Sequence, residues 1–267
     1  MGAKTGLFYY FGYGSNMDLT SIRAKGVEPL TSERAVLPGW ELLFNVAHYF
    51  RHEGGVGNIQ QNNHPGAQVQ GVVHLCEDEA LPRLDAVEAY GIGYDRVTVQ
   101  VETNREQIDA LVYVGMPGFI DNTCLPTQRY MNILIKGAGN AGLSDNYIQM
   151  LKNFPTHVKK AYPPFVPPEK TTRVFNENSL KDYPDYTAIA GLVFDMNGAR
   201  WQHEHLKDLF GGRDMTLWHL KRLDSSDGSE TMDDLRRDRL QDGQRRYLNE
   251  YLHEYNSEYT CVGRFEY

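Results

Sequence analysis

The stretch YFGYGSNMDLTSIRAKG, residues 10–26, places aromatic residues, glycines and a Ser-Asn pair at the junction between a strand-like and a helix-like segment. Backbone N–H groups at the amino terminus of a helix lack intrahelical partners, and the helix dipole there favours negative charge. The turn could therefore bind a carboxylate or an oxyanion. It could equally be an ordinary helix start, because Ser15 and Asn16 are good N-cap residues and Asp18 suits a first turn.

Further strands are expected in the first half of the chain, because apolar and polar residues alternate there between Gly, Asn and Pro. The predicted strands are residues 41–49, 67–75, 94–102 and 109–116. A short helix is expected within residues 77–93, ending at glycines, and two helices separated by a glycine-rich turn within residues 125–154. The pattern indicates an α+β region with a substantial sheet.

The second half begins after two Pro-Pro pairs at residues 163–164 and 167–168, which favour an extended connector. Beyond them we expect a strand at 187–196, short helices at 204–212 and 216–223, and a longer helix at 235–259. The predicted organisation is a first domain at 1–156, a Pro-rich linker at 157–171 and a second compact α+β domain at 172–267.

Composition narrows the class of partner. The net charge of −8 over 267 residues does not favour a nucleic acid, so a small molecule is expected instead. No stretch approaches the ~18 apolar residues of a membrane span and no secretory signal is visible, so a cytoplasmic protein is expected. Cys76, Cys124 and Cys261 lie far apart, which favours free thiols over a disulfide framework or a zinc site.

Glu88 is the candidate acid–base residue. It lies in LDAVEAYGIGYDRV, where a helix gives way to glycines just before the strand that carries Tyr94 and Arg96. A carboxylate surrounded by apolar side chains can have a raised pKa, as a general base working near neutral pH requires. The alternative is a solvated glutamate on a helix face.

Three motifs in order resemble the γ-glutamylcyclotransferase-like family over about residues 7–155: YFGYGSNM, then LDAVEAYGIGYDRVTV, then LPTQRYMNILIKGAGNAGLSDNYIQML. The resemblance implies a small mixed β-barrel flanked by helices. It also implies an enzyme that releases 5-oxoproline from a γ-glutamyl amine, amino acid or peptide such as glutathione, without a metal or cofactor. A homodimer is left open.

The resemblance also implies roles for individual residues. Glu88 would be the catalytic acid/base, and Tyr130 would close over the ligand. The γ-glutamyl group would be bound by Tyr10, Phe11, Gly12, Tyr13, Gly14, Ser15 and Asn16. Two positions depart from the family pattern: Gly12 stands where relatives often have Ala, and Ser144 replaces a common proline. Both changes concern local structure.

Two other motifs suggest different chemistry. GAGNAG at residues 137–142 matches the dinucleotide-binding pattern, but no βαβ unit surrounds it, so a helix terminus is expected. His203 and His205 are spaced i, i+2, which does not place them on one helix face for a zinc site.

Residues 172–267 resemble the cytochrome b5-like family, in particular its membrane-associated progesterone receptor branch. The matching stretches are residues 191–195, 210–216 and 259–265. That branch binds haem through a tyrosine, but Lys207 stands at the corresponding position here. Haem binding is therefore left open beside a second reading, in which the domain is a scaffold for the first. A haem-binding or redox protein whose first domain only binds a ligand is the alternative function.

Overall fold

The computed structural model describes residues 6–169 and 171–267, so Lys170 of the predicted linker lies outside it. The chain divides into two compact units. Unit 1 comprises the residues up to His48 together with Glu53–Val158. Unit 2 comprises Tyr49–His52 and Lys159–Tyr267. A four-residue segment of the first half of the chain thus belongs to unit 2, and all residues from Lys159 on belong to unit 2 as well.

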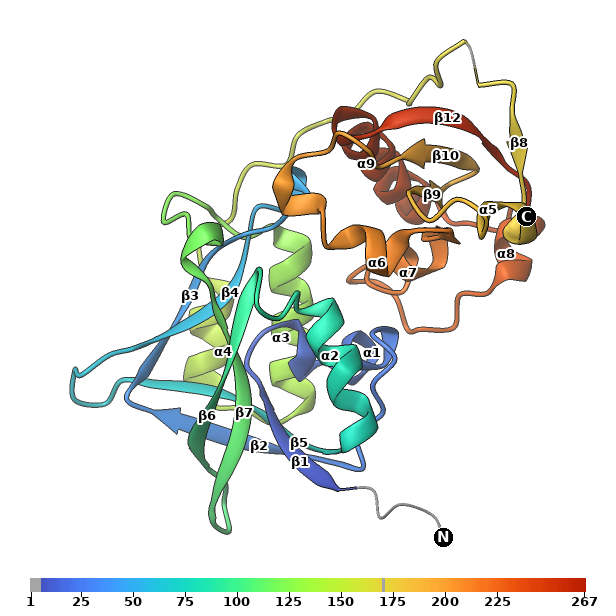
Figure 1. Cartoon of the computed structure of the whole chain (residues 1–267). Helices are drawn as coiled ribbons and strands as arrows, with labels where there is room; N and C mark the ends of the chain where they lie inside the picture. Colours follow the sequence, from blue (N-terminus) through green and yellow to red (C-terminus); the bar gives the residue numbers. More distant parts are fainter. Residues whose placement is uncertain (1–5, 170) are drawn as a thin grey trace, which may run out of the picture. The chain divides into compact units, whose positions relative to one another are not determined.

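Unit 1 is built on a closed five-stranded barrel, which confirms the expected mixed barrel (Figure 1). The strands follow the order β1-β5-β2-β6-β7. Their bounds are β1 Leu7–Gly12, β2 Thr31–Pro38, β5 Gln68–Glu77, β6 Tyr94–Glu102 and β7 Gln107–Gly115. The barrel closes where β1 and β7 run parallel and pair at Tyr10 and Leu111, whereas the other neighbouring strands are antiparallel.

A separate two-stranded sheet, β3 (Trp40–Ala47) with β4 (Gly55–Gln61), also belongs to unit 1. The helices of unit 1 are α1 Leu19–Ala24, α2 Leu81–Val87, α3 Gln128–Asn140 and α4 Asp145–Lys152, with 3-10 turns at Ser15–Met17 (η1), Asp78–Ala80 (η3) and Pro117–Phe119 (η4). The two helices predicted for residues 125–154 are thus present on either side of the glycine-rich turn.

Successive side chains of a strand point to opposite faces, so neighbouring residues of β1 pack in two different apolar clusters. Phe11 is fully buried inside the barrel, among Val73, Val101 and Val112. Tyr10, one residue earlier, lies in another apolar cluster with Ile22 and residues of α2 and β7. This reversal of direction places the Tyr10 side chain outside the barrel interior, beside the turn that follows β1.

The GAGNAG motif is the carboxyl-terminal part of α3, as expected from the sequence. Its first glycine serves close packing: a Cβ built on Gly137 would lie 2.6 Å from the backbone nitrogen of Asp18. Since real Cβ atoms do not approach backbone so closely, α3 can contact the turn after β1 only with glycine at this position.

Unit 2 contains a five-stranded sheet in the order β11-β9-β10-β12-β8 (Figure 1). Its strands are β8 Val174–Phe175, β9 Tyr186–Ile189, β10 Leu192–Asp195, β11 Arg213–Asp214 and β12 Thr260–Phe265. Its helices are α5 Glu177–Leu180, α6 Leu206–Phe210, α7 Thr216–Leu220, α8 Met232–Arg236 and α9 Asp242–Glu258, with 3-10 turns at Arg51–Glu53 (η2) and Trp201–His203 (η5). The turn η2 begins in the Tyr49–His52 segment and ends at Glu53, which belongs to unit 1.

The single strand predicted at 187–196 is wrong, because β9 and β10 form a hairpin there. Ala190 and Gly191 between them both have positive φ, 47° and 79°. Two residues of positive φ make the tight turn whose twist matches antiparallel strands. The apolar run AIAGLVF hid this turn, since Ala does not normally mark a left-handed position.

The segment Tyr49–His52 is part of the core of unit 2. The Phe50 ring is fully buried and stacks on the rings of Phe210 and Tyr255, with centroids 6.4 and 5.2 Å away. The Tyr49 carbonyl accepts hydrogen bonds from Arg200 and His203 at 2.9 Å. Tyr49 and Phe50, from between β3 and β4, thus pack into a core otherwise made mainly by the last third of the chain.

From Lys159 on, the predicted Pro-rich linker belongs to unit 2, and its described residues form no helix or strand. Its Pro163 carbonyl accepts hydrogen bonds from Asn249 and His253 of α9, each at 2.9 Å. The Phe165 backbone N–H donates to the Asn249 side chain at 2.8 Å. The part of the segment around Pro163 and Phe165 is therefore hydrogen-bonded to α9, while Val166 is exposed.

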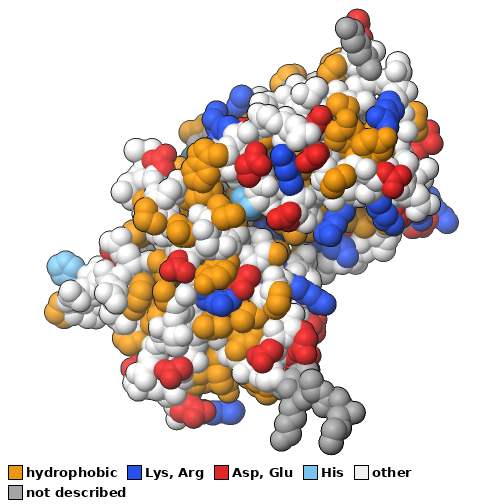
Figure 2. Space-filling view, in the orientation of Figure 1, with side chains coloured by type: hydrophobic (Ala, Val, Ile, Leu, Met, Phe, Trp, Pro, Cys, Tyr) orange, Lys and Arg blue, Asp and Glu red, His pale blue; other side chains and the backbone are white. Residues whose placement is uncertain are grey.

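Charged side chains of both signs are interspersed on the face shown in Figure 2. Within residues 6–169 and 171–267, no helix has the length and apolar character needed to cross a membrane. The expected cytoplasmic location, the homodimer and the exclusion of nucleic acid stay predictions.

Candidate active site

A small cavity of about 40 Å³ in unit 1 gathers most of the residues singled out in the sequence. Its lining consists of Tyr10, Tyr13, Gly14, Ser15, Asn16, Gly57, Glu88, Tyr94, Tyr113 and Tyr130. These residues come from β1, the turn after it, β4, the end of α2, β6, β7 and α3. One carboxylate thus lies within a wall of five phenol rings.

Glu88 is placed by the way α2 ends. It is the last residue to continue the helical hydrogen bonds, its N–H donating to the Leu84 carbonyl at 2.9 Å. The next residue, Ala89, has a left-handed backbone with φ of 50°. Such a conformation is costly for alanine and reverses the chain within a single residue, so the Glu88 side chain is left at the cavity.

The Glu88 carboxylate is held by two donors on the same oxygen. Its Oε1 accepts from Asn16 Nδ2 and from Lys25 Nζ, each at 3.0 Å. Lys25 Nζ also donates to Asn16 Oδ1 at 2.6 Å, which closes a triangle of three side chains. The Lys25 side chain is only 4% exposed and that of Glu88 16%, so this ion pair is largely shielded from water.

The Asn16 turn is fixed by a buried histidine of β5. His74 Nε2 donates to the Asn16 carbonyl at 2.9 Å, and its Nδ1 accepts from the Ser32 hydroxyl at 2.8 Å. Burial lowers the pKa of His74 to about 4, so its ring is neutral at physiological pH. The side chain of Asn16 is held as well as its backbone, because Asn16 Nδ2 also donates to the Tyr10 hydroxyl at 2.6 Å.

The tyrosine hydroxyls have different hydrogen-bond roles. Tyr13 donates to the Tyr113 carbonyl and Tyr94 to the Gly57 carbonyl, both at 2.7 Å. Tyr130 instead accepts from backbone N–H groups, from Gly57 at 3.0 Å and from Ser15. Burial raises the pKa of Tyr130 to about 12, so its hydroxyl keeps a proton that it can donate to a ligand.

Glycine is required where the backbone approaches Tyr130. A Cβ on Gly14 would lie 2.9 Å from the Tyr130 hydroxyl oxygen, and one on Gly57 would lie 3.0 Å from it. The first distance is shorter than real Cβ contacts and the second is tighter than most of them, so a side chain at either position would press on the phenol. The glycines of the turn after β1 and of β4 therefore make room for Tyr130.

Asp85, three residues before Glu88, supports the wall. Both of its oxygens accept from Arg96 at 2.6 Å, and its Oδ1 also accepts from the Tyr113 hydroxyl at 2.7 Å. The Tyr113 ring packs edge-on against Tyr10, with centroids 5.8 Å apart. In the L-D-x-x-E stretch, the aspartate thus fixes a wall residue while the glutamate faces the cavity.

Two predicted binding residues do not line the cavity. Phe11 points into the barrel, because it alternates with Tyr10 along β1. Gly12 contacts the turn instead: a Cβ there would lie 3.1 Å from the carbonyl carbon of Asn16. The other predicted residues meet at the cavity, namely Tyr10, Tyr13, Gly14, Ser15, Asn16, Glu88 and Tyr130.

Gly57, Tyr94, Tyr113 and Lys25 were not predicted as site residues. Tyr94 has a signal in the sequence, since it follows the glycines that end the Glu88 turn. Lys25 has none, because a lysine at the end of a short helix is normally solvated and interacts with the helix dipole. Gly57 lies in β4, a strand whose glycines obscure its pattern.

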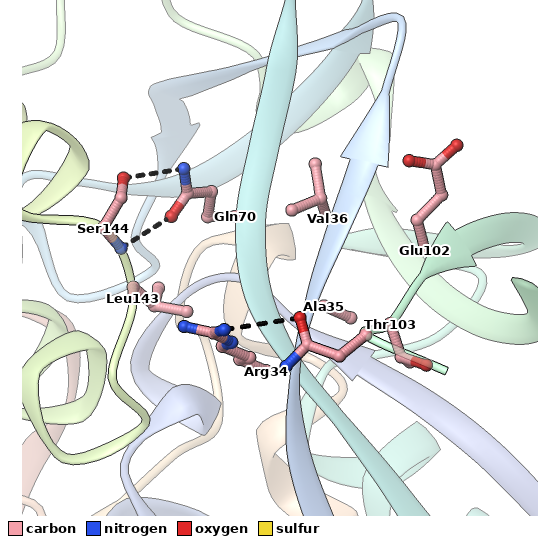
Figure 3. A pocket seen from close by; sticks show the side chains of 9 residues that line it. Arg34, Ala35, Val36, Gln70, Glu102, Thr103, Leu143 and Ser144 are labelled. Atoms are coloured by element: carbon pink, nitrogen blue, oxygen red, sulfur yellow. Dashed lines mark hydrogen bonds between the residues drawn. The ribbon is translucent and has the colours of Figure 1, made fainter. Parts of the chain in front are cut away.

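A second, larger cavity of about 290 Å³ is bordered by β2, β5, the β6–β7 turn and the start of α4 (Figure 3). Gln70 and Ser144 face each other there and share two hydrogen bonds of 2.8 and 3.0 Å. Arg34 donates to the Gly142 carbonyl and to Asn104. The side chains of Arg34, Gln70 and Ser144 are thus used in hydrogen bonds within the protein. The candidate acid/base Glu88 lines the smaller cavity.

Two histidines of unit 2, His203 and His219, are hydrogen-bonded to residues of the same unit. His203 Nε2 donates to the Tyr49 carbonyl and its Nδ1 accepts from Tyr259, so both ring nitrogens are used. His219 Nε2 is bonded to the Tyr255 hydroxyl at 2.9 Å, and Lys207 contacts Glu204 at 3.4 Å. Among the described residues, no group of three or more His, Cys, Asp or Glu could hold a metal ion.

Known proteins resemble the first half of the chain. Gamma-glutamyl cyclotransferase gliK of Claviceps purpurea is 26% identical over 147 residues, which are 52% of this chain and 66% of that protein. Gamma-glutamyl cyclotransferase verK of Clonostachys rogersoniana is 32% identical over 114 residues, 37% of this chain and 64% of that protein. The chain thus spans slightly less than two thirds of the length of these curated relatives.

A solved structure of a protein named Gamma-glutamyl cyclotransferase has a TM-score of 0.52 at 26% identity, covering 59% of this chain and 93% of that one. The cytochrome b5-like resemblance of residues 172–267 has no support in these comparisons and stays a prediction. The family whose model matches, over residues 10–132, is described as Gamma-glutamyl cyclotransferase, AIG2-like, and the resemblance inferred from the sequence is confirmed over that span.

Proposed function

We propose that unit 1 is an enzyme that converts a γ-glutamyl amine, amino acid or peptide into 5-oxoproline and the free amine, with Glu88 as general acid/base. The observation that carries the proposal is the Glu88 carboxylate, fixed by Asn16 and Lys25 inside a tyrosine-lined cavity beside the turn after β1. The relatives named above support the class of reaction; the substrate is our inference.

The chemistry needs few groups. The α-amino group of the glutamyl moiety gives a proton to Glu88 and attacks the γ-carbonyl carbon of the same molecule. This attack closes a five-membered ring and gives a tetrahedral intermediate. When the intermediate collapses, the C–N bond to the leaving amine breaks and Glu88 returns the proton to that nitrogen. Because one carboxyl group serves both proton transfers, no nucleophilic Ser or Cys and no metal or cofactor is required.

The tyrosines and the turn would position the substrate. The Tyr130 hydroxyl, which accepts two backbone N–H groups, can donate its own proton to the oxyanion that develops on the γ-carbonyl oxygen. The Tyr10 hydroxyl accepts from Asn16 and can likewise donate to a bound carboxylate. The glutamyl half would thereby be held in the folded shape that ring closure needs.

Unit 2 is proposed as a scaffold of cytochrome b5-like type rather than a haem carrier. Both ring nitrogens of His203 are hydrogen-bonded, to Tyr49 and Tyr259, and His219 Nε2 is bonded to Tyr255. Its segment Tyr49–His52 leads directly into β4, which carries Gly57 of the cavity.

The test is a panel of γ-glutamyl compounds, covering γ-glutamyl amines, γ-glutamyl amino acids and glutathione, assayed for 5-oxoproline with the full chain. Glu88→Gln keeps the size of the side chain but removes the acid/base, and we expect kcat to fall by about 10²- to 10⁴-fold. Glu79→Gln, an exposed position in η3, is the matched control and should behave as the parent. A parent that turns over nothing, or a Glu88→Gln variant that keeps full activity, would refute the proposal.

A further inference from the structure

We propose that Lys25 is a positioning residue of this site: its ammonium group and the Asn16 amide together fix the Glu88 side chain and keep it as the carboxylate that accepts the substrate's proton. The proposal rests on the function proposed above. Lys25 does not line the cavity, so it acts through Glu88 rather than on the reacting atoms.

The geometry connects three elements at one oxygen atom. Lys25 is the residue that ends α1, Asn16 lies in η1, and Glu88 ends α2. The two donors meet Glu88 Oε1 at 3.0 Å each, and the 2.6 Å bond from Lys25 to Asn16 Oδ1 fixes the donors relative to each other. A bond to one donor would leave the carboxylate free to swing, whereas the triangle defines its orientation.

Burial distinguishes this pair from an ordinary surface ion pair. Arg23 and Glu28, also near α1, form an ion pair with side chains 52% and 68% exposed. The Lys25 side chain is 4% exposed, and a lysine is seldom buried to this extent without a paired charge. The buried charge thus lies directly against the one carboxylate in the cavity lining.

Charge explains what Lys25 would contribute. A cation within hydrogen-bond distance favours the ionised form of a carboxyl group, whereas burial disfavours it. Tyrosines from β1, its following turn, β6, β7 and α3 also interact electrostatically with Glu88, among them Tyr10, Tyr13, Tyr94, Tyr113 and Tyr130. Their pKa values are raised mainly by burial, so they remain neutral. The nearby Asp85 is paired with Arg96, and His74 is neutral.

The test compares Lys25→Met, which removes the charge, with Lys25→Arg, which keeps it. Removing the cation raises the pKa of Glu88, so the pH below which kcat/KM for 5-oxoproline formation declines should rise by about one unit or more. We expect kcat at neutral pH to fall about tenfold in Lys25→Met, because Glu88 is less well oriented. In Lys25→Arg the acid limb of the pH profile should remain that of the parent. Lys152→Met, an exposed position on α4, is the control.

A titration of the Glu88 side-chain carboxyl by ¹³C NMR in the full chain provides a readout that does not need turnover. An upward shift of about one pKa unit or more in Lys25→Met, absent in Lys25→Arg, supports the proposal. An unchanged Glu88 titration or an unchanged acid limb overturns it, even if kcat falls, because a purely structural lysine would give that result. A shifted titration in a chain that forms no 5-oxoproline would instead refute the proposed function while leaving the charge effect intact.

Discussion

A single neutral histidine links the barrel to the site. His74 is fully buried in β5, so protonation of its ring would place a charge in the interior. Its pKa of about 4 in the folded chain lies below the ordinary value of 6.5. The unfolded chain therefore binds the proton more tightly, and the stability from neutral His74 is present above pH 6.5 and lost as pH falls towards 4.

We predict that His74 alone makes the unfolding free energy of unit 1 fall by about 2 kcal/mol between pH 7 and pH 5. In His74→Gln this share of the pH dependence should vanish, because the amide can still donate to the Asn16 carbonyl but does not titrate. Hydrogen exchange of β1 and β5 at both pH values measures the effect, with the exposed His64→Gln as control. Equal pH dependence in His74→Gln and the parent would show that folding does not lower the pKa of His74.

At the scale of elements, the contact between α3 and the turn after β1 decides whether the site is assembled. Gly137 allows the contact, whereas nothing lies within 4 Å of a Cβ built on Gly139, two residues later in the same helix. The two glycines of one motif thus provide a matched pair with opposite expectations.

We predict that Gly137→Ala lowers both stability and kcat/KM, because the new methyl group must displace the backbone of Asp18 and the neighbouring Asn16 turn. A loss of about 1–3 kcal/mol is expected from overpacking of this kind. Gly139→Ala should instead add about 0.5–1 kcal/mol, since alanine is the better helix former. Thermal unfolding and 5-oxoproline assays of both variants check the pair; equal effects would mean that α3 does not pack on the turn.

The parts of unit 1 that could be predicted from the sequence are those with a recognisable pattern within a short stretch of residues. The turn after β1 and the Glu88 loop have glycines and aromatic residues next to their strands, so they could be read from short stretches. The strands β2 and β4 were not predicted, because TSERAVLP carries charges and a proline and GVGNIQQ carries two glycines. Gly57 and Lys25 reach the site through tertiary contacts, which no local pattern reports.

At the scale of the whole molecule, sequence order and spatial units differ at Tyr49–His52. The prolines predict a linker at residues 157–171, and the last stretch of unit 1 ends at Val158. The assignment of four residues of the first half to unit 2 was not predicted, since HYFRHE has no feature that distinguishes it from a hairpin loop of unit 1.

We predict that Phe50→Ala destabilises unit 2, although residue 50 lies in the first half of the sequence. A buried phenylalanine truncated to alanine costs about 3–5 kcal/mol, and Phe50 is fully buried among Phe210, Tyr251 and Tyr255. Hydrogen exchange in α9 reports the loss, with Val166→Ala, 81% exposed, as control. Unchanged protection of α9 would contradict the packing described for Phe50.

The same segment imposes an order on folding during synthesis. During synthesis Phe50 is made long before α9. The hydrogen bond between the Tyr49 carbonyl and Arg200 can form only after a further 151 residues have been added. Pairings this distant in sequence are slow to form, and apolar side chains exposed in the meantime favour aggregation. The segment Tyr49–His52 between β3 and β4 therefore stays unpacked until α9 has been made. During that time we expect it to be accessible to chaperones and proteases.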